Sequence, residues 1–308
     1  MWEVGTSFRL LRSRAAHAVH QPWIDQVRPR MAAAGLDRGR LAELIPPEAP
    51  DDYVPDFLNP APAGPAPTLA AELARVLAAP AAQVRHDLDR LREAPGGLGP
   101  RARALHAEPR AQLPALAEEI TAYWEVALAP YWARVRAVLD ADIFHRARQV
   151  AEHGAAALLN DLHPSVSWND SALRLGRRRR ALARNTAGAG LLLIPSAFTG
   201  PGPLTLVRPP DPPQLAYPAR GVGTLWASRP VVRGDALAAV LGRSKALLLA
   251  ELDSPASTTE LAARTGLSAP AVSQHLTALR DAGLTTAHRT GRSVLYARTA
   301  TAESLLAP

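Results

Sequence analysis

The chain has 308 residues, and its 35 Lys and Arg residues against 28 Asp and Glu residues give a formal net charge of +7. At roughly 150 residues per domain this length indicates about two domains, and the positive charge favours an anionic partner. The chain has no cysteine, which excludes disulfides and thiolate metal sites, and no apolar run of the roughly 18 residues that span a bilayer, so we expect a soluble, cytoplasmic protein without a membrane partner.

Prolines divide the first hundred residues into short segments. Interrupted amphipathic spacing predicts short helices within residues 1–45. The prolines of residues 46–67 remove backbone donors and predict an extended strap laid over a domain. Residues 68–94 predict two helices with a break near Pro80.

The next region is helical and carries most of the clustered aromatic side chains. We predict helical pieces at about 113–128 and 131–159, with a break at Pro130. Clustered aromatic residues most often form core, but they also line pockets for flat ligands. The candidate ligand-binding residues are Tyr123, Trp124 and Trp132.

Short apolar runs bounded by Pro and Gly follow at 191–194, 204–207 and 215–226, and they predict a small sheet. The spacing of the apolar residues changes at residues 229–235, where we place the domain boundary. Residues 236–252 then place leucines and valine on one broad stripe, which predicts a single core helix that is also a candidate dimer helix.

The C-terminal region contains two closely spaced helix signals. Ser257 followed by Glu260 is a capping box, and Gly266 suits the left-handed position after a helix. Ser268 is placed to cap a second helix, in which Val272, Leu276 and Leu279 form the buried seam. Two helices joined by so short a turn predict a helix-turn-helix.

The remaining side chains of this second helix point to DNA. Ser273, Gln274 and Thr277 face outward, where such groups can hydrogen-bond base edges in a major groove; the alternative is a solvated polar surface. Alternating runs then predict a hairpin wing with arginines at its tip for phosphate contact. The predicted DNA-binding residues are Ser268, Ala271, Ser273, Gln274, Thr277, Arg289 and Arg292.

These signals together predict a mainly helical α+β protein. Residues 1–229 form an N-terminal helical domain with a small sheet, of unknown function and with a regulatory or effector role, and residues 230–308 form a winged helix-turn-helix domain that binds double-stranded DNA.

The elements VSQHL, LRDAGL and GRSVLY resemble the winged helix-turn-helix of the ArsR class of bacterial regulators. VPDFLNPAP, LLLIPSAF and LAYPARGVGTLW resemble a domain of unknown function that accompanies this module in GC-rich bacteria. The resemblance implies a homodimer that binds an operator, often as a repressor released by an inducer. Many members of the class sense metals through thiolates or through Asp and His near the C-terminal helix, but this chain has no Cys, and its last residues offer Glu303 without a His. We therefore expect no metal and no cofactor, and a small organic effector in the N-terminal domain.

Two other functions stay open. An enzyme in residues 1–229 is one, although no Gly-x-Ser-x-Gly elbow, His-Glu-x-x-His or phosphate loop is present, so no catalytic residue is named. A nucleoid-type DNA binder with little sequence preference is the other. We interpret the densest basic run of the chain as a solvated loop, with a second DNA contact as the alternative. This run comprises Arg174, Arg177, Arg178, Arg179, Arg180 and Arg184.

Overall fold

The computed structural model describes residues 1–13, 17–47, 53–93, 97–169, 172–176, 190–227, 234–290 and 293–306. The chain forms two compact units. Unit 1 comprises Met1–Ala16, Gly35–Thr121 and Val138–Val222, and unit 2 comprises His17–Ala34, Ala122–Ala137 and Gly223–Pro308. The domain boundary that the sequence predicts between residues 229 and 230 stays a prediction.

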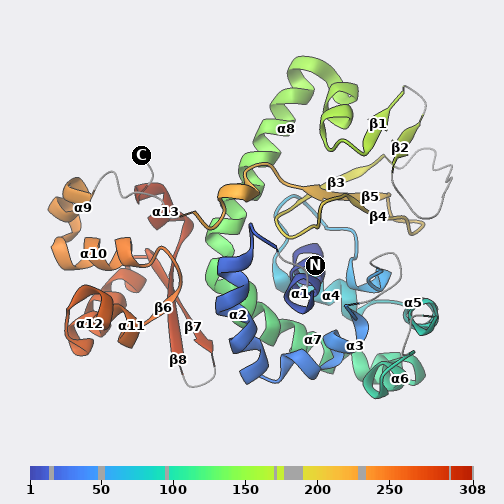
Figure 1. Ribbon diagram of the computed structural model, residues 1–308. Coiled ribbons are helices and arrows are strands. Elements are labelled where there is room, and N and C mark those ends of the chain that lie inside the picture. Colours follow the sequence, from blue (N-terminus) through green and yellow to red (C-terminus); the bar gives the residue numbers. More distant parts are fainter. Residues whose placement is uncertain are drawn as a thin grey trace. The chain divides into compact units, whose positions relative to one another are not determined.

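Helices make up most of unit 1 (Figure 1). Its helical segments are α1 (Trp2–Arg12), η1 (Leu36–Arg38), α3 (Arg40–Leu44), η3 (Asp56–Leu58), α4 (Leu69–Leu77), α5 (Ala81–Arg92), α6 (Pro100–Ala107), α7 (Pro109–Tyr123), most of α8 (Trp132–Asp161, kinked at Gly154) and the start of η6 (Val222–Thr224). The break near Pro80 is as predicted, because Pro80 caps α5 without continuing α4.

The predicted sheet consists of β3 (Leu192–Ser196), β4 (Leu204–Leu206) and β5 (Gln214–Pro218) in the order β3-β5-β4, with β3 parallel and β4 antiparallel to β5. The last run is strand only to Pro218 and then turns, so the predicted strand at 215–226 was too long. A second, unpredicted hairpin pairs β1 (Val166–Trp168) with β2 (Leu173–Leu175).

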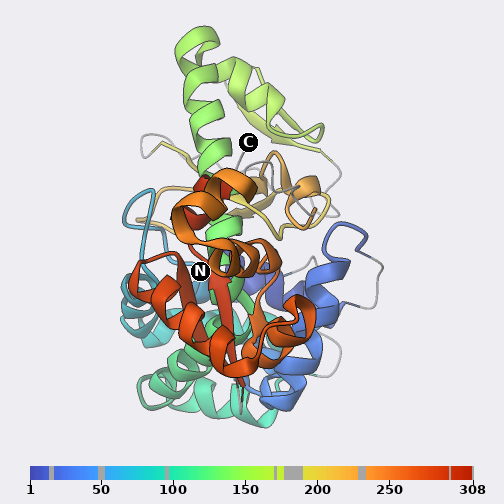
Figure 2. The ribbon, with the colours of Figure 1, turned by 90° about the vertical axis from the view of Figure 1, so that its left-hand side faces the viewer.

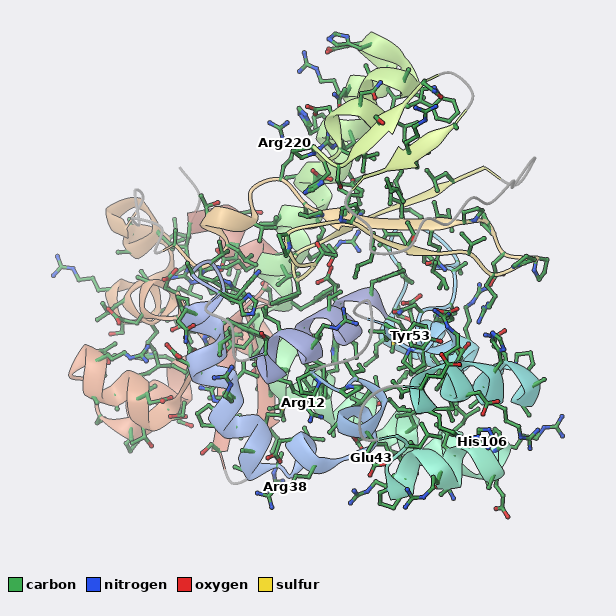
Figure 3. All side chains as sticks on the ribbon, turned by 45° about the vertical axis from the view of Figure 1, so that its right-hand side comes forward. Arg12, Arg38, Glu43, Tyr53, His106 and Arg220 are labelled. Carbon is green, nitrogen blue, oxygen red and sulfur yellow. The ribbon has the colours of Figure 1, made fainter. Side chains whose placement is uncertain are left out.

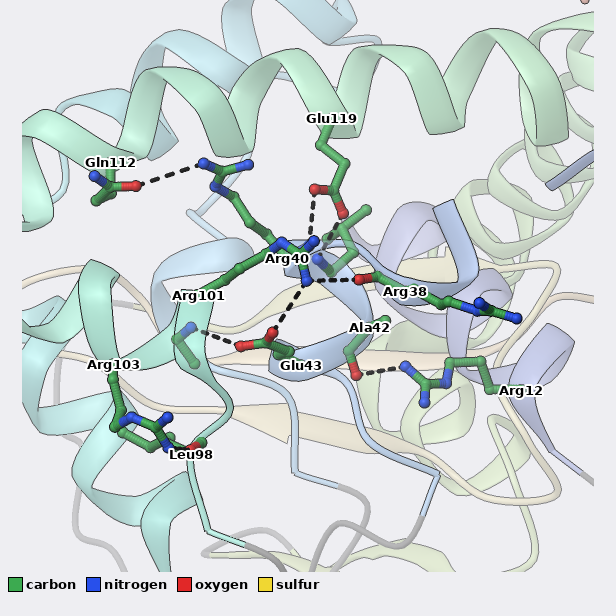
Figure 4. Close-up of polar contacts among 12 residues, drawn as sticks. Arg12, Arg38, Arg40, Ala42, Glu43, Leu98, Arg101, Arg103, Gln112 and Glu119 are labelled. Atoms are coloured by element: carbon green, nitrogen blue, oxygen red, sulfur yellow. Dashed lines mark hydrogen bonds and ion pairs between the residues drawn. The ribbon is translucent and has the colours of Figure 1, made fainter. Parts of the chain in front are cut away.

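Carboxylates from one helix cap another helix in unit 1, as Figure 4 shows. Glu119 of α7 accepts hydrogen bonds from the amides of Arg40 and Leu41, both at 2.8 Å. Glu43 of α3 accepts a hydrogen bond from the amide of Ala102 at 2.8 Å. Free amides in the first turn of a helix attract negative charge, so these two contacts fix α3 and α6 in place.

The described part of the predicted strap packs on α5. Phe57 is fully buried, and its amide donates to Asp87 at 2.7 Å. Tyr53, labelled in Figure 3, belongs to the same segment, and the Arg90 guanidinium lies 3.9 Å from the centre of its ring. The apolar side chains between the prolines therefore hold the strap on unit 1, as predicted for a strap laid over a domain.

Unit 2 combines the C-terminal region with two segments from earlier in the chain. Those segments supply α2 (Gln21–Ala33), the π-helix η4 (Trp124–Leu128) and η5 (Ala129–Tyr131). The indole of Trp23, fully buried, donates to the Ala127 carbonyl at 2.9 Å. Tyr131 accepts from Arg30 and donates to Gln26, both at 3.2 Å, so the two segments are joined by specific polar contacts.

The C-terminal region is a winged helix-turn-helix, drawn in orange and red in Figure 2. Its elements are α9 (Gly234–Leu241), α10 (Arg243–Glu251), β6 (Ala256–Ser257), α11 (Thr258–Thr265), α12 (Ala269–Asp281), β7 (Thr285–Thr290), β8 (Ser293–Arg298) and α13 (Ala300–Leu306). The prediction of a mainly helical α+β fold with a C-terminal winged helix-turn-helix is confirmed.

One helix predicted in this region is in fact two. Gly242 has φ +85°, a left-handed conformation that separates α9 from α10 and that favours glycine. Behind both helices lies one apolar cluster whose larger members are Leu248, Leu249, Leu261, Val272, Leu276 and Leu279.

Among the described residues, no helix is long and apolar enough to cross a membrane.

Candidate nucleic-acid interface

Local signals in the sequence place the two helices of the motif. Ser257 accepts from the Glu260 amide, and the Glu260 carboxylate accepts from the Ser257 amide, which completes the capping box. Burial would raise the pKa of Glu260, but the hydrogen bonds with Ser257 and the charges of Arg30 and Arg264 together outweigh it and lower that pKa. Gly266 has φ +72°, which ends α11 and turns the chain toward α12. Ser268 then accepts from the Ala271 amide at 3.4 Å, so its hydroxyl serves as the cap of α12.

The two faces of α12 differ as predicted. Val272 and Leu276 are fully buried, and Leu279 is nearly so. The side chains of Ser273, Gln274 and Thr277 are exposed, and Ala271 and His275 are half-buried. Burial of the apolar seam therefore presents the polar face to solvent, which is the arrangement that base contacts require.

The exposed side chains are not equally free to bind. Thr277 donates its hydroxyl proton to the Ser273 carbonyl at 3.0 Å and keeps only its lone pairs for a partner. Within the described residues, the amide of Gln274 makes no hydrogen bond, so both its donor and its acceptor are available. Gln274 therefore has the largest unused hydrogen-bonding capacity on this face.

The wing is formed by β7 and β8, which pair in an antiparallel register from Thr285 with Arg298 to Thr290 with Ser293. Arg289 is exposed near the tip. Arg292 lies outside the described residues. His288, on the same strand as Arg289, lies 3.4 Å from Glu125 of η4, so the wing strand also contacts a segment from far earlier in the chain.

The other basic candidates lie mostly outside what the structure describes. Arg174 is exposed on β2. Arg177, Arg178, Arg179, Arg180 and Arg184 are not among the described residues, and the role of this run stays open.

The three aromatic residues predicted to bind a ligand do not share one environment. Tyr123 is fully buried, whereas Trp124 and Trp132 are half-buried and contact each other at 4.7 Å between ring centres. A cavity does lie in unit 2, but among the described residues its walls include Tyr131 and Trp226 and none of these three. Their assignment to a ligand site stays a prediction.

Sequence reasoning missed four charged residues around this cavity: Arg134, Asp253, Arg298 and Glu303. Arg134 lies more than a hundred residues before the other three, and the set matches no motif. The signal in the sequence is the apolar run Leu295–Ala297 directly before Arg298, which places the guanidinium at the end of a buried stretch of β8.

Two families match parts of the chain. Residues 243–286 match the family described as bacterial regulatory protein, arsR family, and residues 99–223 match a family of unknown function (DUF5937). The comparisons with curated proteins and with solved structures gave no match. The first match spans α10 to the start of β7, and the second precedes it, which confirms the resemblance to a regulator of this class that carries an N-terminal region of unknown function.

Proposed function

Because the C-terminal region carries an arsR-family helix-turn-helix, which indicates a DNA-binding transcriptional regulator rather than an enzyme, we propose that the chain is a repressor that binds a specific operator as a homodimer. A small organic effector releases it from DNA. The observation that carries this proposal is the polar face of α12, opposite a buried apolar seam.

Each part of the module has its own role in DNA binding. Gln274 reads a base edge, because a free amide can match the donor and acceptor of adenine, while Ser273 and Thr277 adapt to neighbouring bases. Arg289 contacts phosphate and adds affinity without sequence preference. Ser268 caps α12, and the N-terminus of that helix faces the DNA in this proposal.

Exposed apolar side chains support the homodimer. Val240 on α9 is 82% exposed and Leu247 on α10 is 41% exposed. Side chains of this kind next to a buried core favour a partner surface, and a two-fold dimer would place its two α12 helices in successive major grooves, about one helical turn apart.

The test starts from selection of an operator out of random duplexes, followed by binding isotherms on that operator and on a scrambled duplex. Gln274→Ala should lose about 1–3 kcal/mol of operator affinity per half-site and leave binding to the scrambled duplex nearly unchanged. Thr301→Ala is the matched control, because Thr301 is exposed on α13, outside α12 and the wing.

Failure to select any preferred sequence would favour the non-specific DNA binder. Equal losses on both duplexes for Gln274→Ala would contradict base readout by α12.

A further inference from the structure

A cavity of about 200 Å³ lies within unit 2. Three parts of the chain form its walls: Pro22 and Gln26 of α2, Tyr131 and Arg134 around the start of α8, and residues from Trp226 through the helix-turn-helix region. The last group includes Asp253, three residues before β6, and Arg298 of β8. A molecule in this cavity would therefore touch both the DNA-binding module and the segments that pack with it.

Four charged side chains meet at the cavity. Asp253 accepts from Arg134 at 2.6 Å and lies 3.7 Å from Arg298. Glu303 lies 3.7 Å from Arg298 and 4.0 Å from Arg134. Two arginines and two carboxylates alternate, so the cluster is electrically neutral.

The four charged side chains differ in how many further hydrogen bonds they make and in how deeply they are buried. The Arg298 guanidinium also donates to the carbonyls of Leu249 and Ala250, both at 2.6 Å, at the end of α10, and only 3% of its side chain is exposed. Arg134 donates outside the cluster only to the Leu225 carbonyl, at 3.4 Å, among the described residues. Asp253 is the most exposed member, at 30%. The Arg134 to Asp253 contact is thus the one that a ligand can open.

A ligand that opens this contact must keep each buried charge paired. An anion alone would draw Arg134 away from Asp253, which would then rely on Arg298 at 3.7 Å, and a cation alone would draw Asp253 away from Arg134, whose side chain is only 10% exposed. Weakening the pairing of a largely buried charge costs free energy. A molecule with one carboxylate and one ammonium satisfies both, with the carboxylate on Arg134 and the ammonium on Asp253.

The rest of the cavity suits a small apolar body. Tyr131 and Trp226 meet edge to face at 5.6 Å, and three prolines, Pro22, Pro130 and Pro255, complete this wall. The volume of about 200 Å³ is smaller than the roughly 300–1,000 Å³ of pockets for larger ligands, which favours a ligand of amino-acid size.

We propose that this cavity binds a small zwitterion of the α-amino acid type, inserted between Arg134 and Asp253, and that this molecule is the effector of the regulator. The effector role rests on the proposed function, whereas the binding site does not. Coupling has a short path, because the turn at Asp253 to Pro255 leads into β6 and the cap of α11, and Arg298 ends the wing strand.

The direct test is calorimetry of the full chain with each standard L-amino acid at millimolar concentration. We expect at least one apolar member to bind with one site per chain. If L-leucine binds, its decarboxylated amine, 3-methylbutylamine, and its deaminated acid, 4-methylpentanoate, should each bind at least tenfold more weakly. No binding by any amino acid, or equal binding by the amine or the acid, would overturn the proposal.

Variants locate the site. Ala133→Leu fills the cavity without changing its charge and should weaken binding at least tenfold, whereas Ala137→Leu, exposed one turn further along α8, should not. Asp253→Asn removes the partner of the ammonium and should shift the preference from L-leucine to 4-methylpentanoate. Unchanged binding by Ala133→Leu, or an unchanged preference in Asp253→Asn, would place the ligand elsewhere.

The effector role is tested separately by titrating the selected operator with and without the bound amino acid. We expect operator affinity to change at least fivefold. An amino acid that binds without changing operator affinity would overturn the effector role, while absence of any operator would count against the proposed function and leave the calorimetric result standing.

Discussion

Polar side chains in unit 2 fall into two contrasting groups. On α12, Ser273 and Gln274 are exposed, and Gln274 makes no hydrogen bond within the described residues. Around the cavity, Arg298 and Glu303 are almost fully buried, and every charge lies within 4.0 Å of an opposite charge.

The first group is free to bind another molecule, whereas the second group is already paired within the protein. An exposed amide loses little by staying in water and gains on meeting a base edge. A buried charge must keep its partners, because its hydration has been lost. We therefore expect changes on α12 to alter DNA binding with little effect on stability, and changes in the buried cluster to do the opposite.

The largest expected effect tests the buried side of this comparison. Arg298→Met removes two hydrogen bonds to the end of α10 and leaves Asp253 and Glu303 with Arg134 alone, and it should lower the free energy of unfolding by about 3–5 kcal/mol. Arg280→Met is the matched control, since Arg280 is exposed and, among the residues that the structure describes, forms an ion pair with Asp281 alone, at 3.5 Å; it should cost under about 1 kcal/mol. Denaturant unfolding measures both, and equal losses would break the comparison.

A buried acid in unit 1 extends the comparison to pH. Burial raises the pKa of Glu3 from 4.5 to about 7, against hydrogen bonds from Ser196 and from the Ala197 amide at 3.0 Å. The folded chain therefore holds the proton that the unfolded chain releases between pH 4.5 and 7, so this group lowers the free energy of unfolding by about 3 kcal/mol as pH rises across that window.

Glu3→Gln cannot ionise and can still accept the hydrogen bond from Ala197. We expect it to flatten the fall in stability between pH 4.5 and 7, whereas Glu93→Gln, at an exposed position, should leave the slope as it is. Unfolding curves at several pH values decide this; a slope identical to that of the parent chain would show that Glu3 is ionised in the folded state.

The smallest effect concerns the exposed side of the comparison. Arg289→Ala should weaken binding to operator and scrambled duplex alike and lower the slope of log affinity against log salt by about one per lost phosphate contact. Stability should change by no more than about 0.5 kcal/mol, because the side chain is exposed. A loss confined to the operator would mean that Arg289 reads bases.

The sequence by itself determined the helix-turn-helix and its wing. A capping box at Ser257, a left-handed turn at Gly266 and a cap at Ser268 each act within four residues, so their conformations follow from the adjacent side chains alone. The buried seam of α12 follows from the helical repeat in the same way.

Only the tertiary structure decided what lies beside that module. Residues 17–34 and 122–137 join it in one compact unit, and Arg134 meets Asp253 across more than a hundred residues of chain. Neither segment carries a local signal for this pairing, because the stabilisation comes from burying Trp23 and Tyr131 and from neutralising charge in a place that exists only after the chain has closed. The cavity and the arrangement of charges around it therefore depend on the tertiary structure. The face that we assign to DNA follows instead from the thirteen consecutive residues of α12.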